Sequence, residues 1–279
     1  MRPPGRGRNR GWLTLRLVVL GILAVLFLLP FYVLVRNAFA SNRLITAARW
    51  RWLPDQLDLT NFRALFEDGN VSMASSMLHS AVMSITQTSL TVLISLLAGY
   101  ALARYDNRLS RALLGLTLFT LMVPAAVTFI PMFVMTAQLG WIDSYRGLVV
   151  PGLFSAFATY LFRQNFLGFP VELEEAARVD GANPWTTFWR VVAPNSLGIV
   201  GAVATITFIG SWNAFLWPLL VGRENTRTVQ VTLSQFMTSQ GVNYPVLFAG
   251  ALVAIIPVVG VFLFLQRFLV EGVETSGLK

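Results

Sequence analysis

The chain contains no cysteine, which excludes disulfide bonds and thiol chemistry without identifying the compartment of the protein. It has a single histidine, His79, and neither a metal-ligand set of typical spacing nor a plausible Ser-His-Asp triad is found. His79 stands where a long apolar run begins, and a place at the membrane edge explains it better than a role as a proton relay. We therefore expect a protein that is not an enzyme and that holds no metal or cofactor.

Lysine is almost absent as well, since the only one is the terminal Lys279. A Walker A motif needs a lysine between Gly and Ser or Thr, so the chain cannot supply its own P-loop. Transporters that use an ion gradient instead usually carry ionisable residues in mid-membrane. Asp, Glu, Lys and Arg are missing from the apolar runs at 80–103, 112–142, 191–222 and 245–266. This absence favours a separate ATPase as the energy source.

Charged residues make up only 12% of the chain and hydrophobic residues 55%, with a mean hydropathy of +0.64. A soluble domain would not need this much apolar sequence, and most uncharged runs reach the roughly 20 residues that cross a membrane. These runs lie at 17–35, 79–103, 112–142, 147–162, 191–222 and 245–266. The run at 147–162 is short and needs Arg163 to snorkel or to face protein. We predict an all-α membrane protein with six transmembrane helices.

The first apolar run resembles part of a signal peptide. The basic start MRPPGRGRNR precedes it, and AFA at 38–40 has the pattern of a cleavage site. The run at 17–35 is longer than the roughly 7–15 residues of a typical signal-peptide core. We therefore expect an uncleaved first helix.

Six spans place both termini on the same side of the membrane. That side carries the larger share of the 21 Lys and Arg residues, so the positive-inside rule places it in the cytoplasm. We expect cytoplasmic tails at 1–16 and 271–279, a membrane domain at 17–270, and external segments at 37–78 and 222–245. The net charge of +8 does not indicate nucleic-acid binding, because the arginines lie between the apolar runs and form no continuous stripe.

One polar stretch, ELEEAARVDGANPW at 172–185, separates the predicted fourth and fifth helices. Pro170 can open a helix whose first turns are rich in glutamate, where the helix dipole favours carboxylates. Gly181 would end that helix in the left-handed conformation, and Asn183 and Pro184 would begin a second one. The stretch is therefore predicted to be a helix-turn-helix on the cytoplasmic side.

The second helix of this stretch has an apolar face. Trp185, Phe188 and Trp189 recur at helical spacing, and Pro194 is expected to break the helix before the fifth span. Such an aromatic face fits a surface that docks a partner protein, and it fits equally well a helix that lies on lipid headgroups. The residues alone do not separate these two interpretations.

The stretch resembles the EAA loop of ABC-importer permeases, whose pattern is E-A-A, three residues, G, nine residues, I-x-L-P. The sequence has Glu175-Ala176-Ala177, Gly181, Val191 and Ala193-Pro194 at that spacing, with Val in place of Ile and Ala in place of Leu. Five further stretches resemble the carbohydrate-uptake, maltose-type branch of this family: AGYALAR at 98–104, MVPAAVTFIPMF at 122–133, LGWIDSYRGLVVPGL at 139–153, WNAFLWPLL at 212–220 and LQRFLVEGVETSGLK at 265–279. The resemblance implies a single permease domain over residues 1–279.

In that family the EAA loop forms coupling helices that sit in a groove of a cytoplasmic ATPase. The resemblance implies an ATPase-coupling role for Glu174, Glu175, Ala176, Ala177, Asp180, Gly181, Trp185, Phe188 and Pro194. It also implies three kinds of protein partner: a second permease subunit, two cytoplasmic ABC ATPase subunits and an extracytoplasmic substrate-binding protein. The expected location is the cell membrane of a prokaryote, in contact with lipid and with no nucleic acid bound.

Uncharged polar side chains inside the predicted spans are candidates for the solute pathway. Gln87 lies in a polar cluster of the second span, and Asn213 lies in the fifth beside Trp212 and Phe215. Such groups suit a sugar, although hydrogen bonds between helices require the same residues. The preferred function is a permease subunit for a sugar or a related solute. The alternatives are a permease for another solute and a membrane scaffold that docks a cytoplasmic partner without transport.

Overall fold

A computed structural model describes residues 10–54, 56–67, 72–238 and 241–274 of the chain. These residues form two compact units. The first unit comprises Met1–Asn70 and Gln235–Val253, and the second comprises Val71–Ser234 and Ala254–Lys279. Helices dominate both units, which agrees with the predicted all-α membrane protein.

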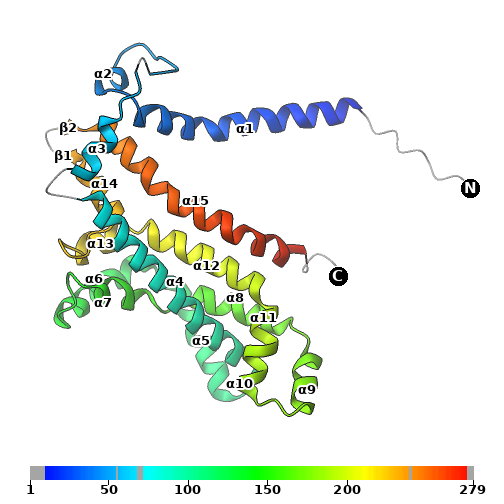
Figure 1. The fold of residues 1–279 in the computed structure, drawn as a ribbon. Coiled ribbons are helices and arrows are strands. Elements are labelled where there is room, and N and C mark those ends of the chain that lie inside the picture. The colour runs from blue at the N-terminus through cyan, green and yellow to red at the C-terminus, as the bar shows by residue number, and fades with distance from the viewer. Residues whose placement is uncertain (1–9, 55, 68–71, 239–240, 275–279) are drawn as a thin grey trace, which may run out of the picture. The chain divides into compact units, whose positions relative to one another are not determined.

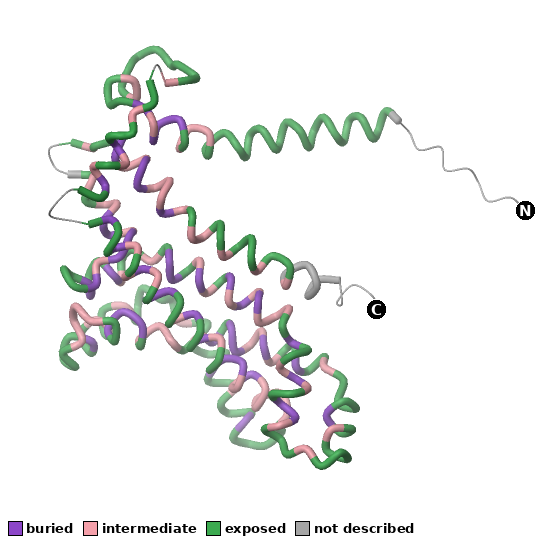
Figure 2. Tube along the Cα trace, in the orientation of Figure 1, coloured by how far each residue is buried: buried purple, intermediate pink, exposed green. Residues whose placement is uncertain are grey.

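The first unit contains helices α1 (Arg10–Ala38), α2 (Asn42–Ile45) and α3 (Thr60–Glu67), strands β1 (Met237–Thr238) and β2 (Gly241–Val242), and the beginning of α15 (Tyr244–Glu274). The two strands pair antiparallel. Most of α1 is exposed along its length, as Figure 2 shows, which suits an apolar helix surrounded by lipid. The side-chain amide of Asn61 donates hydrogen bonds to the carbonyl oxygens of Ala38 and Ala40, and these bonds tie α3 to the end of α1.

The second unit contains α4 (Met73–Arg104), α5 (Arg108–Met122), α6 (Ala125–Gln138), α7 (Tyr145–Val149), η1 (Val150–Gly152), α8 (Ala156–Leu167), α9 (Val171–Val179), α10 (Pro184–Thr187), η2 (Phe188–Val192), α11 (Ala193–Asn195), α12 (Leu197–Trp212), α13 (Leu216–Val221), α14 (Val229–Gln235) and the rest of α15. The 32-residue helix α4 runs through this unit, and α8 and α12 pack beside it (Figure 1).

Small side chains allow α4 and its neighbours to approach closely. Ser84, Thr91 and Ser95 are buried at intervals of seven and four residues, so they share one face of α4. Gly99 continues this face, and a Cβ atom there would lie 2.6 Å from the Cβ atom of Phe162 on α8. Two backbones can meet this closely only where one of them carries no side chain, as in other membrane helix pairs.

Three helices in the described part of the chain are long and apolar enough to cross a membrane: Gly11–Ala38, Met73–Arg104 and Tyr244–Phe268. Two bent helix pairs add up to two more spans, α5 with α6 at an angle of 102° and Pro184–Asn195 with α12 at 75°. The described residues therefore provide between three and five spans by length and composition. The number six stays a prediction.

The predicted third and fourth spans are not continuous helices. The run at 112–142 breaks at Val123, whose extended backbone follows from the proline next to it, Pro124. The run at 147–162 is divided into α7, η1 and α8, because Pro151 lacks a backbone donor and the Ser155 hydroxyl caps a new helix. Helix α8 has 12 residues and a length of about 18 Å, which is less than the hydrocarbon thickness of a membrane.

Candidate functional site

The polar stretch at 172–185 forms two helices joined by a tight turn, as its sequence predicts. Pro170 precedes α9, which ends at Val179. Gly181 has a φ of +84° and so adopts the left-handed conformation that lets the chain reverse. The side-chain oxygen of Asn183 then accepts a hydrogen bond of 2.8 Å from the backbone N–H of Thr186 and caps α10.

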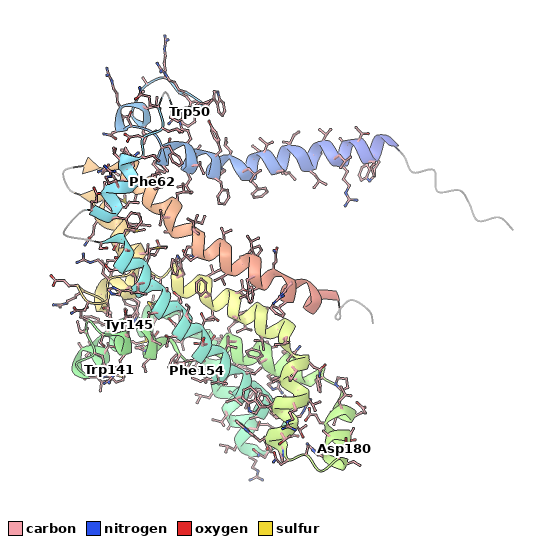
Figure 3. The ribbon with its side chains drawn as sticks, in the orientation of Figure 1. Trp50, Phe62, Trp141, Tyr145, Phe154 and Asp180 are labelled. Atoms are coloured by element: carbon pink, nitrogen blue, oxygen red, sulfur yellow. The ribbon has the colours of Figure 1, made fainter. Side chains whose placement is uncertain are left out.

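Helix α10 continues into the π-helical turn η2 and then into α11. The chain bends after Ser196, where α12 begins. Pro194 lies near the start of α11, so the break before α12 follows two residues after this proline. The whole loop, from α9 to α11, lies at one end of the second unit, where Figure 3 labels Asp180.

The residues assigned to ATPase coupling divide into an exposed and a buried group. Glu175, Ala176, Asp180, Gly181, Trp185 and Pro194 are exposed, and Ala177 is half-buried. Apolar side chains in this loop are exposed as well: Val179 has 88% of its surface exposed, and Trp185 has 62%. An exposed apolar patch of this kind, next to two carboxylates, is a surface on which another protein can dock.

Glu174 and Phe188 do not belong to that surface. The Glu174 side chain is fully buried, and its Oε1 atom lies 2.6 Å from Nη2 and 2.7 Å from Nε of Arg104, the last residue of α4. Its Oε2 atom accepts a hydrogen bond of 2.8 Å from the hydroxyl of Tyr100. Both carboxylate oxygens of Glu174 are therefore used inside the protein.

Phe188 anchors the second half of the loop by apolar packing. It is 2% exposed and belongs to a core cluster with Phe162, Phe166 and Val192. The Tyr100 ring lies 4.8 Å from the Phe188 ring, measured between centroids, and 5.5 Å from the Phe166 ring. Aromatic rings at these separations add to the free energy of burial, so this half of the loop is fixed to α4 and α8.

The proposed pathway residues do not form one site. Gln87 lies in a cavity of about 300 Å³ between α4, α8 and α12, where its amide donates to the carbonyl oxygen of Gly152 at 3.3 Å and accepts from the Ser211 hydroxyl at 2.9 Å. These bonds join three helical segments. Phe154, labelled in Figure 3, lines the same cavity. The amide of Gln87 is thus engaged in holding helices together.

The other three pathway candidates lie at the end of α12. Trp212 is buried, and its indole N–H donates a hydrogen bond of 3.1 Å to the carbonyl oxygen of Ala254. Asn213 is exposed and accepts a hydrogen bond from the side-chain amide of Gln230 at 3.2 Å. Phe215 is 42% exposed. Of this group, Asn213 and Phe215 are free to meet a solute or a partner.

A second polar cluster, centred on Asp143, lies toward the other end of α4, where Figure 3 labels Trp141 and Tyr145. The Asp143 carboxylate accepts hydrogen bonds from the backbone N–H of Arg223 at 2.9 Å and from the Thr226 hydroxyl at 2.8 Å. The backbone N–H and the side-chain amide of Asn225 donate to it as well. Burial alone would raise the pKa of Asp143, but these hydrogen bonds outweigh it and hold the pKa below its ordinary value.

Sequence reasoning missed Arg104, Tyr100 and Asp143 as structural centres. All three lie in stretches that carry the family resemblance, AGYALAR and LGWIDSYRGLVVPGL. The signal that could have found Arg104 is its place directly after an apolar run, four residues after a tyrosine. The partner of Arg104, however, is 70 residues away in the sequence, and no local pattern identifies it.

Known proteins resemble this chain in sequence over most of its length. Residues 91–275 match the family described as "binding-protein-dependent transport system inner membrane component". The arabinooligosaccharides transport system permease protein AraQ of Bacillus subtilis (strain 168) is 34% identical over 261 residues, which cover 92% of each chain. The sn-glycerol-3-phosphate transport system permease protein UgpE of Escherichia coli O157:H7 is 34% identical over 278 residues, which cover 96% of this chain and 98% of that protein.

Solved structures share the fold. A chain in the crystal structure of a bacterial ABC transporter involved in the import of the acidic polysaccharide alginate superposes with a TM-score of 0.82 at 24% identity, over 95% of this chain and 99% of that chain. A second structure of a bacterial alginate ABC transporter, in complex with an alginate pentasaccharide-bound periplasmic protein, gives a TM-score of 0.55 at 14% identity, over 93% and 94% of the two chains. The chain therefore belongs to the family of binding-protein-dependent transport system inner membrane components, as a permease subunit of an ABC importer.

Proposed function

We propose that this chain forms half of the translocation pathway of an ATP-driven importer for a sugar or a related solute, which an extracytoplasmic binding protein delivers. The observation that carries this proposal is the surface formed by Glu175, Ala176, Asp180, Gly181 and Trp185 on an otherwise apolar membrane chain. The surface is carried by the two short helices α9 and α10. Because the chain lacks a P-loop, such a surface has a clear use as the contact with a separate ATPase.

The coupling loop and both termini are assigned to the cytoplasm, and the segment around Asp143 and Arg223 to the opposite side. The charge distribution of the chain supports this orientation. A second permease subunit is expected to complete the pathway. An apolar groove of about 490 Å³ between α4, α12 and α15, lined by Phe208 and Phe264, offers a surface for contact with lipid or with that subunit.

The solute class is supported by two relatives whose names state carbohydrate or polyol-phosphate transport. The direct test is uptake in a strain that lacks this gene, complemented by the wild-type chain. Radiolabelled arabinooligosaccharides, sn-glycerol-3-phosphate and an amino acid mixture are the three probes. Restored uptake of either of the first two supports the proposal. Restored uptake of the amino acids alone would identify a permease for another solute, and uptake of none, with ATPase subunits still bound, would favour the scaffold.

Gly181 provides a sharp test of the coupling role. Its φ of +84° strains most side chains, and a β-branched one in particular, although a Cβ atom there meets no atom within 4 Å, so only the backbone conformation is tested. Gly181→Val should reorient α9 relative to α10, at a cost of about 1–2 kcal/mol or more for a branched residue, and uptake should be lost at normal membrane abundance. Gly181→Asn is the matched control, since asparagine tolerates this conformation. Equal uptake with Val and Asn would show that the turn has no coupling role.

A further inference from the structure

Helix α9 carries most of the proposed docking surface but has few attachments of its own. Glu174 is the buried residue of this helix, while its neighbours Leu173 and Glu175 are exposed. A nine-residue helix held by apolar packing would bury a stripe of aliphatic side chains. The residue that holds α9 to the remainder of the second unit is instead a carboxylate.

Arg104 joins Glu174 to two further segments at the same point. Its Nη1 atom donates to the carbonyl oxygen of Phe166 at 2.8 Å, and its Nη2 atom to that of Phe169 at 3.4 Å. These carbonyl groups stand at and just beyond the end of α8, where helices leave acceptors without an internal partner. One guanidinium therefore ties the last turn of α4 to the end of α8 and to α9. We call Arg104, Glu174 and Tyr100 the α4–α9 latch.

The backbone contact beneath the latch prevents α4 and α8 from sliding past each other. A Cβ atom at Gly99 would lie 2.9 Å from the backbone nitrogen of Arg163, and the Arg163 side chain donates to the carbonyl oxygen of Leu102 at 3.2 Å. Close-packed interiors resist continuous deformation. The ends of α4 and α8 therefore form one rigid base, and the latch fixes α9 to it.

The chemistry of the latch suits a mechanical link better than a source of stability. A buried ion pair gains little net free energy, because the loss of hydration offsets the attraction of the charges. It does fix geometry, since Nε and Nη2 of the planar guanidinium both donate to Oε1 of Glu174 while the Tyr100 hydroxyl donates to Oε2. Removal of one charge leaves the other buried and unpaired, whereas removal of both leaves a neutral pocket.

We propose that Glu174 is a positioning residue, which through Arg104 makes α9 and the end of α4 move as one body, so that displacement of the docking surface reaches the membrane helix. The proposal rests on the coupling role of the loop stated above. It assigns different roles to two adjacent glutamates: Glu175 faces the partner, and Glu174 faces the protein. The latch is expected to be present in both end states of the transport cycle.

The test measures how firmly α9 is held to the end of α4, and it does not depend on transport. The chain has no cysteine, so nitroxide labels at Val179→Cys on α9 and Tyr105→Cys after α4, both exposed positions, report one distance in the complete complex in lipid nanodiscs. Pulsed electron paramagnetic resonance should give a narrow distance distribution that shifts little between nucleotide-free and MgATP–vanadate states. Glu174→Gln should broaden it about twofold, because an uncharged amide oxygen accepts more weakly from the guanidinium than the carboxylate does. The matched control, Glu175→Gln, should leave the width unchanged.

A double variant separates positioning from folding. Glu174→Gln alone and Arg104→Gln alone should both lower the melting temperature of the complex. The combined variant should recover most of that loss, since no unpaired charge is left, while the broad distribution persists. Binding-protein-stimulated ATP hydrolysis should stay about tenfold reduced in all three variants, within the range of measured coupling between distant sites.

The outcomes are decisive in either direction. A narrow distribution in Glu174→Gln, or recovery of stimulated hydrolysis together with the melting temperature in the double variant, would overturn the proposal. Absence of stimulated hydrolysis in the wild-type complex would count against the proposed function instead. In that case the width of the distance distribution still decides whether the latch holds α9.

Discussion

Two carboxylates hold loops near opposite ends of α4, and they do so by different means. Glu174 is buried and faces the charged guanidinium of Arg104. Asp143 is half-buried and accepts hydrogen bonds from neutral groups of the described residues, namely the backbone or side chains of Arg223, Asn225 and Thr226. Helix α9 of the loop assigned to the cytoplasm is therefore held mainly by an ion pair, and the loop assigned to the outside by several hydrogen bonds from neutral groups.

This difference determines how each loop responds to substitution of the residues that hold it. An ion pair whose carboxylate is fully buried is all-or-none, because that charge cannot be left without its partner at low cost. A carboxylate with several neutral donors loses them one at a time, and water can replace each of them at a partly exposed position. We expect the first arrangement to transmit a displacement and the second to hold a loop that can adapt to a partner.

The largest effect is expected from Arg104→Met. The substitution leaves the Glu174 carboxylate buried without its partner, and the resulting loss is about 3–5 kcal/mol. The melting temperature of the purified complex, followed by tryptophan fluorescence, should fall sharply. Arg111→Met is the control, since it breaks an exposed ion pair with Asp106 and should cost at most about 1 kcal/mol. Equal shifts for the two variants would mean that burial of the latch has no energetic consequence.

A smaller loss is expected from Gly99→Ala, which tests the base beneath the latch. The new Cβ atom lies 2.6 Å from the Cβ atom of Phe162, so α4 and α8 must separate, at about 1–3 kcal/mol for overpacking. Gly115→Ala, on α5 with no atom within 4 Å, should be neutral or stabilise by up to about 1 kcal/mol. Melting curves of the two variants, side by side, check the prediction. A destabilised Gly115→Ala beside a normal Gly99→Ala would contradict the packing.

The local structure of the coupling loop could be predicted from its sequence because its signals act over a few residues. Pro170, Gly181 and Asn183 fix where helices begin and end through backbone conformation and side-chain capping, which involve only nearby residues. The division between Glu174 and Glu175 could not be predicted. Successive helical residues point about 100° apart, and which one faces inward depends on how α9 is rotated against α4.

The membrane helices show the same limit of prediction from sequence over longer segments. Apolar length identified α1, α4 and α15, since composition alone decides whether such a helix can cross a membrane. The run at 112–142 is equally apolar, yet it bends by 102° because Pro124 forces Val123 into an extended conformation. Apolar length measures compatibility with lipid and does not exclude a break inside the run.

The stability contributed by the loop that Asp143 holds should depend on pH. The folded pKa of Asp143 lies below its unfolded value, so this group contributes stability that is fully present above the unfolded value near 4 and is lost as pH falls through the folded value. Asp143→Asn should remove this dependence and cost about 1 kcal/mol, because its amide N–H₂ meets the donor of Asn225. Melting temperatures of both proteins between about pH 3 and pH 7 test this, with Asp106→Asn, at an exposed position, as the control.

Single cysteine substitutions should have the smallest effect on the protein. They test whether the two loops lie on opposite sides of the membrane. Val179→Cys and Glu224→Cys both replace exposed side chains, so neither should change stability by more than about 0.5 kcal/mol. In intact cells a membrane-impermeant maleimide should label Glu224→Cys and spare Val179→Cys, while in inverted vesicles the pattern should reverse. The wild-type chain, which has no cysteine, provides the blank in both preparations. If both positions were labelled from the same side, the segments would share one face of the membrane. The Asp143 and Glu174 contacts could then not serve an outer and an inner partner, and the assignment of the coupling loop to the cytoplasm would have to be withdrawn.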